Sequence, residues 1–139
     1  MSCYINPVNQ DLCIYLTYEG SCSMIELMSA RYEANALLAE RVWNRIVVDI
    51  TGLSSQFAAP ELFEFAKGLS ADLPQSVRVA LVARPDQAKQ AKLIEGIARK
   101  EGLFLMFFLE VEEATAWAKG MNVHGRMKPQ LAGNLAKAS

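Results

Sequence analysis

The chain has 139 residues, of which 52% are hydrophobic and 21% are charged, a composition typical of one globular domain with a single core. Lys and Arg number 14 and Asp and Glu number 15, a near-balance that argues against a general nucleic-acid binder, which carries a basic excess. The charge is nevertheless uneven along the chain. Residues 1–118 hold 10 basic and 15 acidic side chains, whereas residues 119–139 hold four basic ones (Lys119, Arg126, Lys128 and Lys137) and no acidic ones.

The sequence predicts a cytoplasmic protein without a membrane span. Its start lacks the basic segment and the apolar stretch of a signal peptide. The longest apolar run, 103–109, has seven residues and is too short to cross a bilayer.

The cysteines and the single histidine favour neither a disulfide scaffold nor a metal site. The three cysteines are Cys3, Cys13 and Cys22, an odd number with no C-x-x-C pair, and His124 is the only histidine. We therefore expect buried thiols and neither metal nor cofactor. Cys3 and Cys13 could face each other across a hairpin and oxidise.

A β-hairpin is predicted over residues 3–6 and 12–18. Leu12, Ile14 and Leu16 alternate with Cys13, Tyr15 and Thr17, the two-residue period of a strand. Pro7 and residues 8–11 have the composition of the turn between the two strands.

A long helix is predicted next, from a cap at Ser21 or Ser23 to about Arg41. Glu26 follows Ser23 by three residues, the spacing of a capping box. Apolar residues at three- and four-residue intervals predict the face that meets the core: Ile25, Met28, Tyr32, Ala36, Ala39 and Val42.

Two strands and two helices are predicted in alternation after this helix. Residues 45–50 form a β-branched run typical of an interior strand, and the loop 51–59 leads to a helix that begins at Pro60 and ends before Pro74. The apolar side of that helix is predicted from Leu62, Phe63, Phe65, Ala66 and Leu69. Residues 77–82 form the next strand, and Asp86 is the predicted N-cap of a helix that stops at Gly102.

A strand over 103–108 and a helix over 110–119 complete the predicted domain, which spans 1–119. The order is β-β-α-β-α-β-α-β-α, so the fold class is α/β, with a mixed, mostly parallel sheet and about four helices. Residues 120–139 show no clear periodicity and are predicted to be a basic, flexible C-terminal tail.

Motifs of the common enzyme classes are missing from the sequence. It has no G-x-G-x-x-G, no P-loop and no G-x-S-x-G elbow, and its one histidine lies in the tail. The acidic pairs Glu61–Glu64 and Glu112–Glu113 are typical of solvated helix surfaces. We therefore predict a protein that is not an enzyme, because general acid–base catalysis needs placed titratable groups.

Polar residues follow the strand that ends near Asp49 and Ile50. In open α/β sheets, ligands bind beyond the carboxyl ends of the strands, and a helix N-terminus favours anions. The predicted binding residues for a ligand or protein partner are Thr51, Ser54, Ser55, Gln56 and Pro60. The same hydroxyls would equally serve as caps of turns.

Three segments carry a resemblance to a known family. They are 46–53, a strand followed by Asp, Ile, Thr and Gly; 77–83, a central strand; and 108–117, a strand-end Phe followed by Glu, Ala and Trp. Over residues 3–119 the chain resembles the SpoIIAA-like proteins, related to the STAS domain of anti-sigma-factor antagonists. The resemblance implies a non-enzymatic domain that binds a protein partner or a small ligand near residues 51–60, as a possible homodimer.

The resemblance also identifies one departure from the family pattern. Phosphoregulated STAS proteins carry Asp-Ser-Ser-Gly at the start of the helix after this strand, and a partner kinase phosphorylates one serine. The matching stretch here, 57–60, reads Phe-Ala-Ala-Pro and has no hydroxyl.

Two alternative functions remain open beside a binding domain. The first is a carrier of a lipid-like or other apolar ligand, because the resemblance relates the fold to that of Sec14-like domains. The second is a small enzyme.

Overall fold

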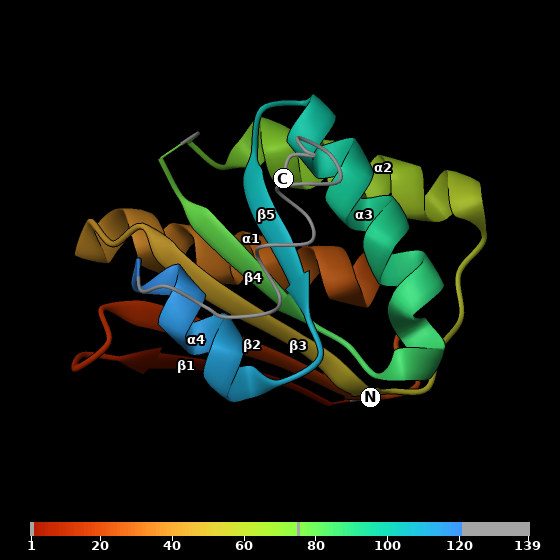
Figure 1. Ribbon diagram of the computed structural model, residues 1–139, viewed down its shortest axis with the longest axis horizontal. Helices are drawn as coiled ribbons and strands as arrows, with labels where there is room; N and C mark the ends of the chain where they lie inside the picture. Colours follow the sequence, from red (N-terminus) through yellow and green to blue (C-terminus); the bar gives the residue numbers. More distant parts are fainter. Residues whose placement is uncertain (1, 75, 121–139) are drawn as a thin grey trace.

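The computed structural model describes residues 2–74 and 76–120 and contains the predicted order of elements (Figure 1). The elements are β1 (Ser2–Val8), β2 (Cys13–Gly20), α1 (Met24–Arg41), β3 (Arg45–Leu53), α2 (Ala59–Asp72), β4 (Arg78–Val82), a 3₁₀ turn (Pro85–Gln87), α3 (Ala88–Lys100), β5 (Phe104–Phe108) and α4 (Val111–Ala118). From residue 121 on, the predicted tail lies outside the described residues.

The five strands form one mixed sheet in the order β1-β2-β3-β4-β5. β1 pairs with β2 antiparallel, and the pairs β2–β3, β3–β4 and β4–β5 are parallel. A helix joins each parallel pair, as this connection requires, so the predicted α/β class and the mixed sheet are confirmed.

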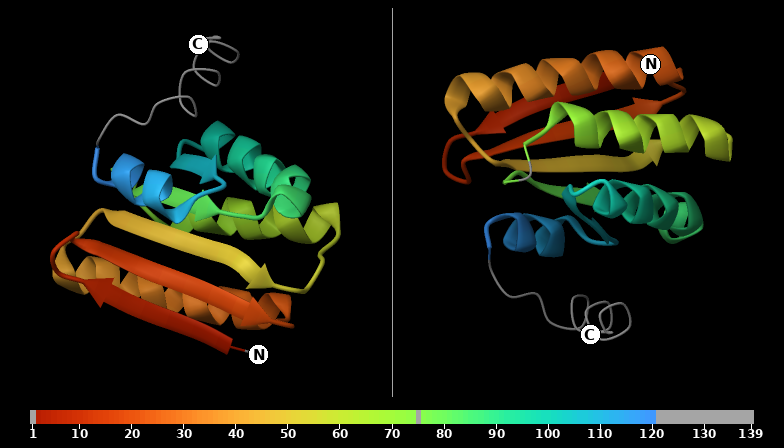
Figure 2. Two further views of the ribbon diagram at one scale, coloured as in Figure 1. Left: turned by 60° about the horizontal axis from the view of Figure 1, so that its bottom comes forward. Right: turned by 90° about the horizontal axis from the view of Figure 1, so that it is seen from above.

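Helices cover the two faces of the sheet unequally. α1, α2 and α3 lie on one face and α4 lies alone on the other (Figure 2). Because strand side chains alternate between faces, Ile46 and Val48 of β3 belong to the larger core, and Val47 belongs to the smaller one. Trp117 of α4 is completely buried in the smaller core.

The predicted core face of α1 is wrong. Ile25 and Val42 are 76% and 88% exposed, and the buried positions are instead Leu27, Ala30, Arg31, Ala34 and Leu38. Arg31 lies within this buried row, where its guanidinium pairs with Asp72 at 3.0 Å and donates to the Phe65 carbonyl at 3.3 Å. Because one of these buried positions is a charged arginine, a prediction based on the spacing of hydrophobic residues does not find this face of α1. The predicted capping box of Ser23 and Glu26 is present.

The hairpin differs from its prediction in two respects. Pro7 lies within β1 rather than in the turn, and it is tolerated there because β1 is an edge strand. Cys3 is opposite Tyr18, whereas Cys13 is opposite Val8. The two cysteines therefore do not face each other, and the predicted disulfide geometry is wrong.

The start of α3 is also corrected. Asp86 is not its N-cap: it lies in the 3₁₀ turn, where its carboxylate accepts from the Arg84 guanidinium at 2.9 Å. α3 begins at Ala88. Within the described ranges, no helix is both long and apolar enough to cross a membrane.

Candidate functional site

The carboxyl edge of the parallel strands carries the predicted binding residues. β2, β3 and β4 run in the same direction, so their ends lie along one edge, and the starts of α1 and α2 follow there (Figures 1 and 2). β3 extends to Leu53, three residues beyond its predicted end, so the loop before α2 comprises only residues 54–58.

Two of the five predicted residues, Thr51 and Ser55, use their hydroxyls in hydrogen bonds within the protein. Thr51 lies in β3, and its Oγ1 donates to Asp49 Oδ1 at 2.7 Å. Ser55 Oγ donates to the Cys22 carbonyl at 2.8 Å and accepts from the Cys22 N–H at 2.7 Å. Ser55 therefore ties the loop to the start of α1, the turn-forming role that the sequence left open.

The other three predicted residues are exposed. Ser54 follows β3, and its backbone N–H donates to the Gly20 carbonyl at 2.9 Å, which leaves its side chain in solvent. Gln56 lies in the middle of the loop, and Pro60 lies in the first turn of α2. The loop that carries Ser54 and Gln56 is held by the Ser54 N–H and by the Ser55 hydroxyl.

Arg84 and Gln87 hold the end of β3, and sequence reasoning missed both. The Arg84 guanidinium donates to the carbonyls of Thr51 and Leu53. Gln87 Nε2 donates to the carbonyls of Ile50 and Leu53 at 2.8 and 3.2 Å. These bonds join residues 31–37 positions apart, so no local pattern could indicate them. The guanidinium of Arg84 also lowers the pKa of the Asp86 carboxyl through its hydrogen bond.

Phe63 adds an apolar side chain to this edge. It was predicted to face the core, but it is 43% exposed, and Lys67 Nζ lies 5.2 Å from its ring centroid. Phe63 is three residues after Pro60, so the two side chains share one face of α2. We call Ser54, Gln56, Pro60 and Phe63 the entry surface, since all four are exposed and lie in the loop before α2 or in its first two turns.

The start of α2 lacks a hydroxyl cap. Ala58 is the N-cap residue and makes no side-chain hydrogen bond. Only the Glu61 half of a capping box exists, in which Glu61 Oε1 accepts from the Ala58 N–H at 2.9 Å. Ser, Thr, Asp or Asn is the usual residue at such a position.

Burial shifts the pKa values of two titratable side chains near the hairpin. Burial raises the pKa of the Cys13 thiol to about 12, so this group is protonated near neutral pH, and a thiolate is needed for nucleophilic attack. Burial also raises the pKa of Tyr15 to about 12. Among residues 2–74 and 76–120, no three His, Cys, Asp or Glu side chains come together as a metal site.

Two small cavities lie within the larger core. One, of about 20 Å³, is bounded by Tyr18, Arg31 and Phe65, and another, of about 40 Å³, by Leu27, Phe57 and Leu62. Sites for drug-sized ligands have volumes of roughly 300–1,000 Å³. Neither cavity can hold a lipid-like ligand in this conformation.

Comparison with known proteins yields structural likeness only. No family model matches the sequence, and no curated protein matches it significantly. An anti-sigma factor antagonist from Mycobacterium paratuberculosis superimposes with a TM-score of 0.63 at 10% identity, over 85% of this chain and 93% of that one. An uncharacterised protein with a SpoIIAA-like fold from Shewanella loihica superimposes with a TM-score of 0.54 at 16% identity, over 84% and 92%.

These similarities show the fold. The chain has a SpoIIAA-like, STAS-like α/β fold, as the three sequence segments implied. At 10% and 16% identity the likeness does not extend to individual site residues.

Proposed function

We propose that this chain is a non-enzymatic regulatory domain that binds a protein partner through its entry surface. The observation that carries the proposal is the combination of exposed Ser54, Gln56 and Phe63 with a backbone fixed by Ser55, Arg84 and Gln87. A preorganised surface loses little conformational entropy on association, and an aromatic side chain beside polar groups is typical of interface centres.

The fold supports a protein as the partner rather than a small ligand. One of the similar structures is an anti-sigma factor antagonist, a name that describes action on another protein. The small cavities of the larger core disfavour carriage of an apolar ligand, the alternative considered from the sequence. The homodimer predicted from the sequence stays a prediction, because nothing in this surface requires a second copy.

We also propose that serine phosphorylation at the start of α2 does not switch this binding. Ala58 and Ala59 occupy the N-cap and first position of α2, and neither offers an oxygen to a kinase. Ser54 and Ser55 lie earlier in the chain, and the Ser55 hydroxyl is engaged with Cys22 at both its donor and its acceptor side.

A matched pair of variants tests the entry surface. Phe63→Glu places a charge on it, and Leu93→Glu makes the same kind of change on α3, where Leu93 is 38% exposed. The tagged full-length chain and both variants are incubated with lysate of the source cells, and captured proteins are quantified by mass spectrometry. We expect one partner to be retained by the wild type and by Leu93→Glu, but reduced at least about tenfold by Phe63→Glu.

Equal capture by all three chains would refute this choice of surface, and so would loss of the partner with Leu93→Glu alone. Urea unfolding of each variant serves as the folding control. Both substitutions are at partly exposed positions, so we expect stability changes within about 1 kcal/mol.

A further inference from the structure

The outer edge of β1 is open over only part of its length. β1 is at one end of the sheet, and β2 is its only neighbouring strand within the described chain. In an antiparallel pair, every second residue of an edge strand directs its N–H and C=O away from its partner. Pro7 has no N–H and is best tolerated at such an outward position. The same two-residue period then makes Cys3 and Ile5 outward-facing, with free backbone donors.

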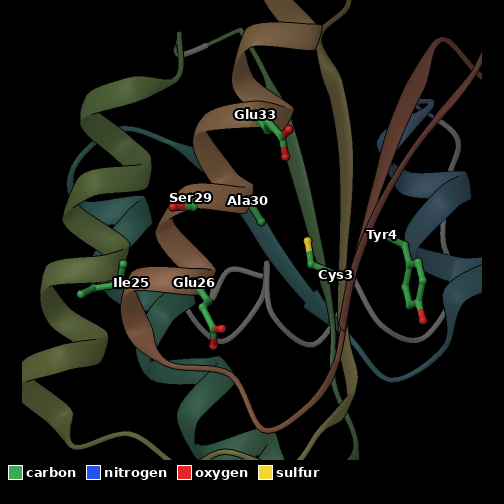
Figure 3. Close-up of a pocket in the computed structure, with 7 residues that line it drawn as sticks. All are labelled: Cys3, Tyr4, Ile25, Glu26, Ser29, Ala30 and Glu33. Carbon is green, nitrogen blue, oxygen red and sulfur yellow. The ribbon is translucent and has the colours of Figure 1, made fainter. Parts of the chain in front are cut away.

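A groove accompanies this open part of the edge. It has a volume of about 580 Å³, lies between β1 and α1, and is lined by Cys3, Tyr4, Ile25, Glu26, Ser29, Ala30 and Glu33. Figure 3 shows the Cys3 sulfur directed toward α1 and the Tyr4 ring on the opposite side of β1. We call this the β1 groove. The outward backbone groups of Cys3 and Ile5 beside this groove could pair with those of an added strand.

The charges of the β1 groove select a basic occupant. Glu26 and Glu33 of α1 both line it, and no basic side chain among residues 2–74 and 76–120 does. A second copy of the chain, added edge to edge about a two-fold axis, would bring the same two carboxylates toward their equivalents. Such like-charge pairing is unfavourable, so the groove favours a strand that carries Lys or Arg.

The chain itself contains a segment of this kind. Residues 121–128 read Met-Asn-Val-His-Gly-Arg-Met-Lys, in which Met121, Val123 and Met127 alternate with polar residues that include Arg126 and Lys128. Residues 120–139 as a whole show no periodicity, but over these eight residues alone the alternation would give a strand one apolar and one basic face. Residues 119–139 contain no acidic side chain that would oppose Glu26 and Glu33.

The end of α4 brings this segment within reach of the β1 groove. Lys119 Nζ lies 3.1 Å from Asp11 Oδ1, so the chain leaves α4 beside the turn between β1 and β2. From Val8 to Cys3 the strand extends about 17 Å. Arg126 and Lys128 follow Gly120 by six and eight residues and can lie up to about 20 and 26 Å from it.

We propose that residues 121–128 add to the open edge of β1 as an antiparallel strand of the same molecule, with Arg126 and Lys128 facing Glu26 and Glu33. The apolar residues of this strand then lie beside Tyr4, which is 54% exposed. The segment itself lies outside the described residues, and the proposal rests on the groove, its charges and the pattern in the sequence.

Amide hydrogen exchange of the full-length chain, resolved by NMR, tests the pairing. We expect the Cys3 and Ile5 amides to be protected in the wild type and to exchange at least about tenfold faster in Arg126→Gln/Lys128→Gln. Lys137→Gln is the matched control, since it removes a positive charge outside the segment. The amide of Val47, in the central strand, reports that every variant is folded.

A charge exchange extends the test. Glu33→Lys alone should lose the protection, and Glu33→Lys combined with Arg126→Glu should restore it, because the antiparallel direction places Arg126 nearer Glu33 than Lys128. Glu64→Lys on α2 should have no effect. Glu26 is left intact because it caps α1. Unprotected Cys3 and Ile5 amides in the wild type, or protection that survives Arg126→Gln/Lys128→Gln, would overturn the proposal. Protection that increases with protein concentration would also overturn it, because the strand would then come from another copy.

Discussion

The substitution Gly68→Ala probes the buried arginine of α1. Gly68 lies in the interior of α2, where replacement of Gly by Ala normally stabilises a helix by about 1 kcal/mol. A Cβ at Gly68, however, would lie 2.7 Å from Arg31 Nη1 and 3.1 Å from Nη2. Arg31 is 2% exposed and is held by Asp72 and the Phe65 carbonyl, so a shift of its guanidinium would disturb both contacts.

The balance of these effects predicts a net loss. Displacement of the guanidinium weakens a hydrogen bond from a charged donor, which contributes about 1.5–3 kcal/mol. The ion pair with Asp72 adds little to this loss, because the Asp72 carboxylate is 29% exposed and solvent screens it. Against a helix gain of about 1 kcal/mol, we expect Gly68→Ala to destabilise the wild type by roughly 0.5–2 kcal/mol.

A second background isolates the cause. In Arg31→Met the new side chain is apolar and has no guanidinium for the Cβ to meet, so we expect Gly68→Ala to stabilise that variant by up to about 1 kcal/mol. The free energies of unfolding of the four chains come from urea titration, followed by the fluorescence of Trp117 and Trp43. The same change in both backgrounds would refute the reasoning, since the proposed clash requires Arg31.

Two further predictions follow from buried groups. Burial raises the pKa of the Cys13 thiol from 9.0 to about 12 in the folded chain, so its contribution to stability is present below pH 9 and is lost as the pH rises toward 12. Over this pH range the urea midpoint of Cys13→Ala should therefore fall less steeply than that of the wild type. Parallel curves for the two chains would contradict this assignment. Gln87→Leu removes the side-chain donor that the carbonyls of Ile50 and Leu53 share, so it should lower the free energy of unfolding in urea by about 1–3 kcal/mol. Gln56→Leu, in the exposed loop, is the control and should change this free energy little. Equal losses in the two variants would show that Gln87 does not anchor β3.

The order of elements could be predicted because each strand and helix carries its period in its own residues. The β-branched run of β3 and the Ser23–Glu26 capping box are local signals, and the structure contains both. The core face of α1 could not be predicted in the same way. Burial of Arg31 depends on Asp72 and on the Phe65 carbonyl, which belong to another helix.

The place of the loop residues in the fold was predictable, but their contacts were not. The carboxyl edge of a parallel sheet follows from the order of strands, and Ser54, Gln56 and Pro60 are exposed there. Only the fold brings Cys22 to Ser55, and Arg84 and Gln87 to the end of β3. Exposure of Phe63 was missed because an aromatic residue at helical spacing is indistinguishable from a core residue in sequence.

The lone helix on the second face has a consequence for biosynthesis. Val47, Ala80 and Met106 face α4, and in the described chain no other helix covers them. α4 is also the last described element to be synthesised, so this apolar row stays uncovered on the nascent chain until Trp117 emerges. At translation rates of roughly 5–20 residues per second, the interval between Met106 and Trp117 lasts about one second, during which a chaperone or another nascent chain can reach the second face.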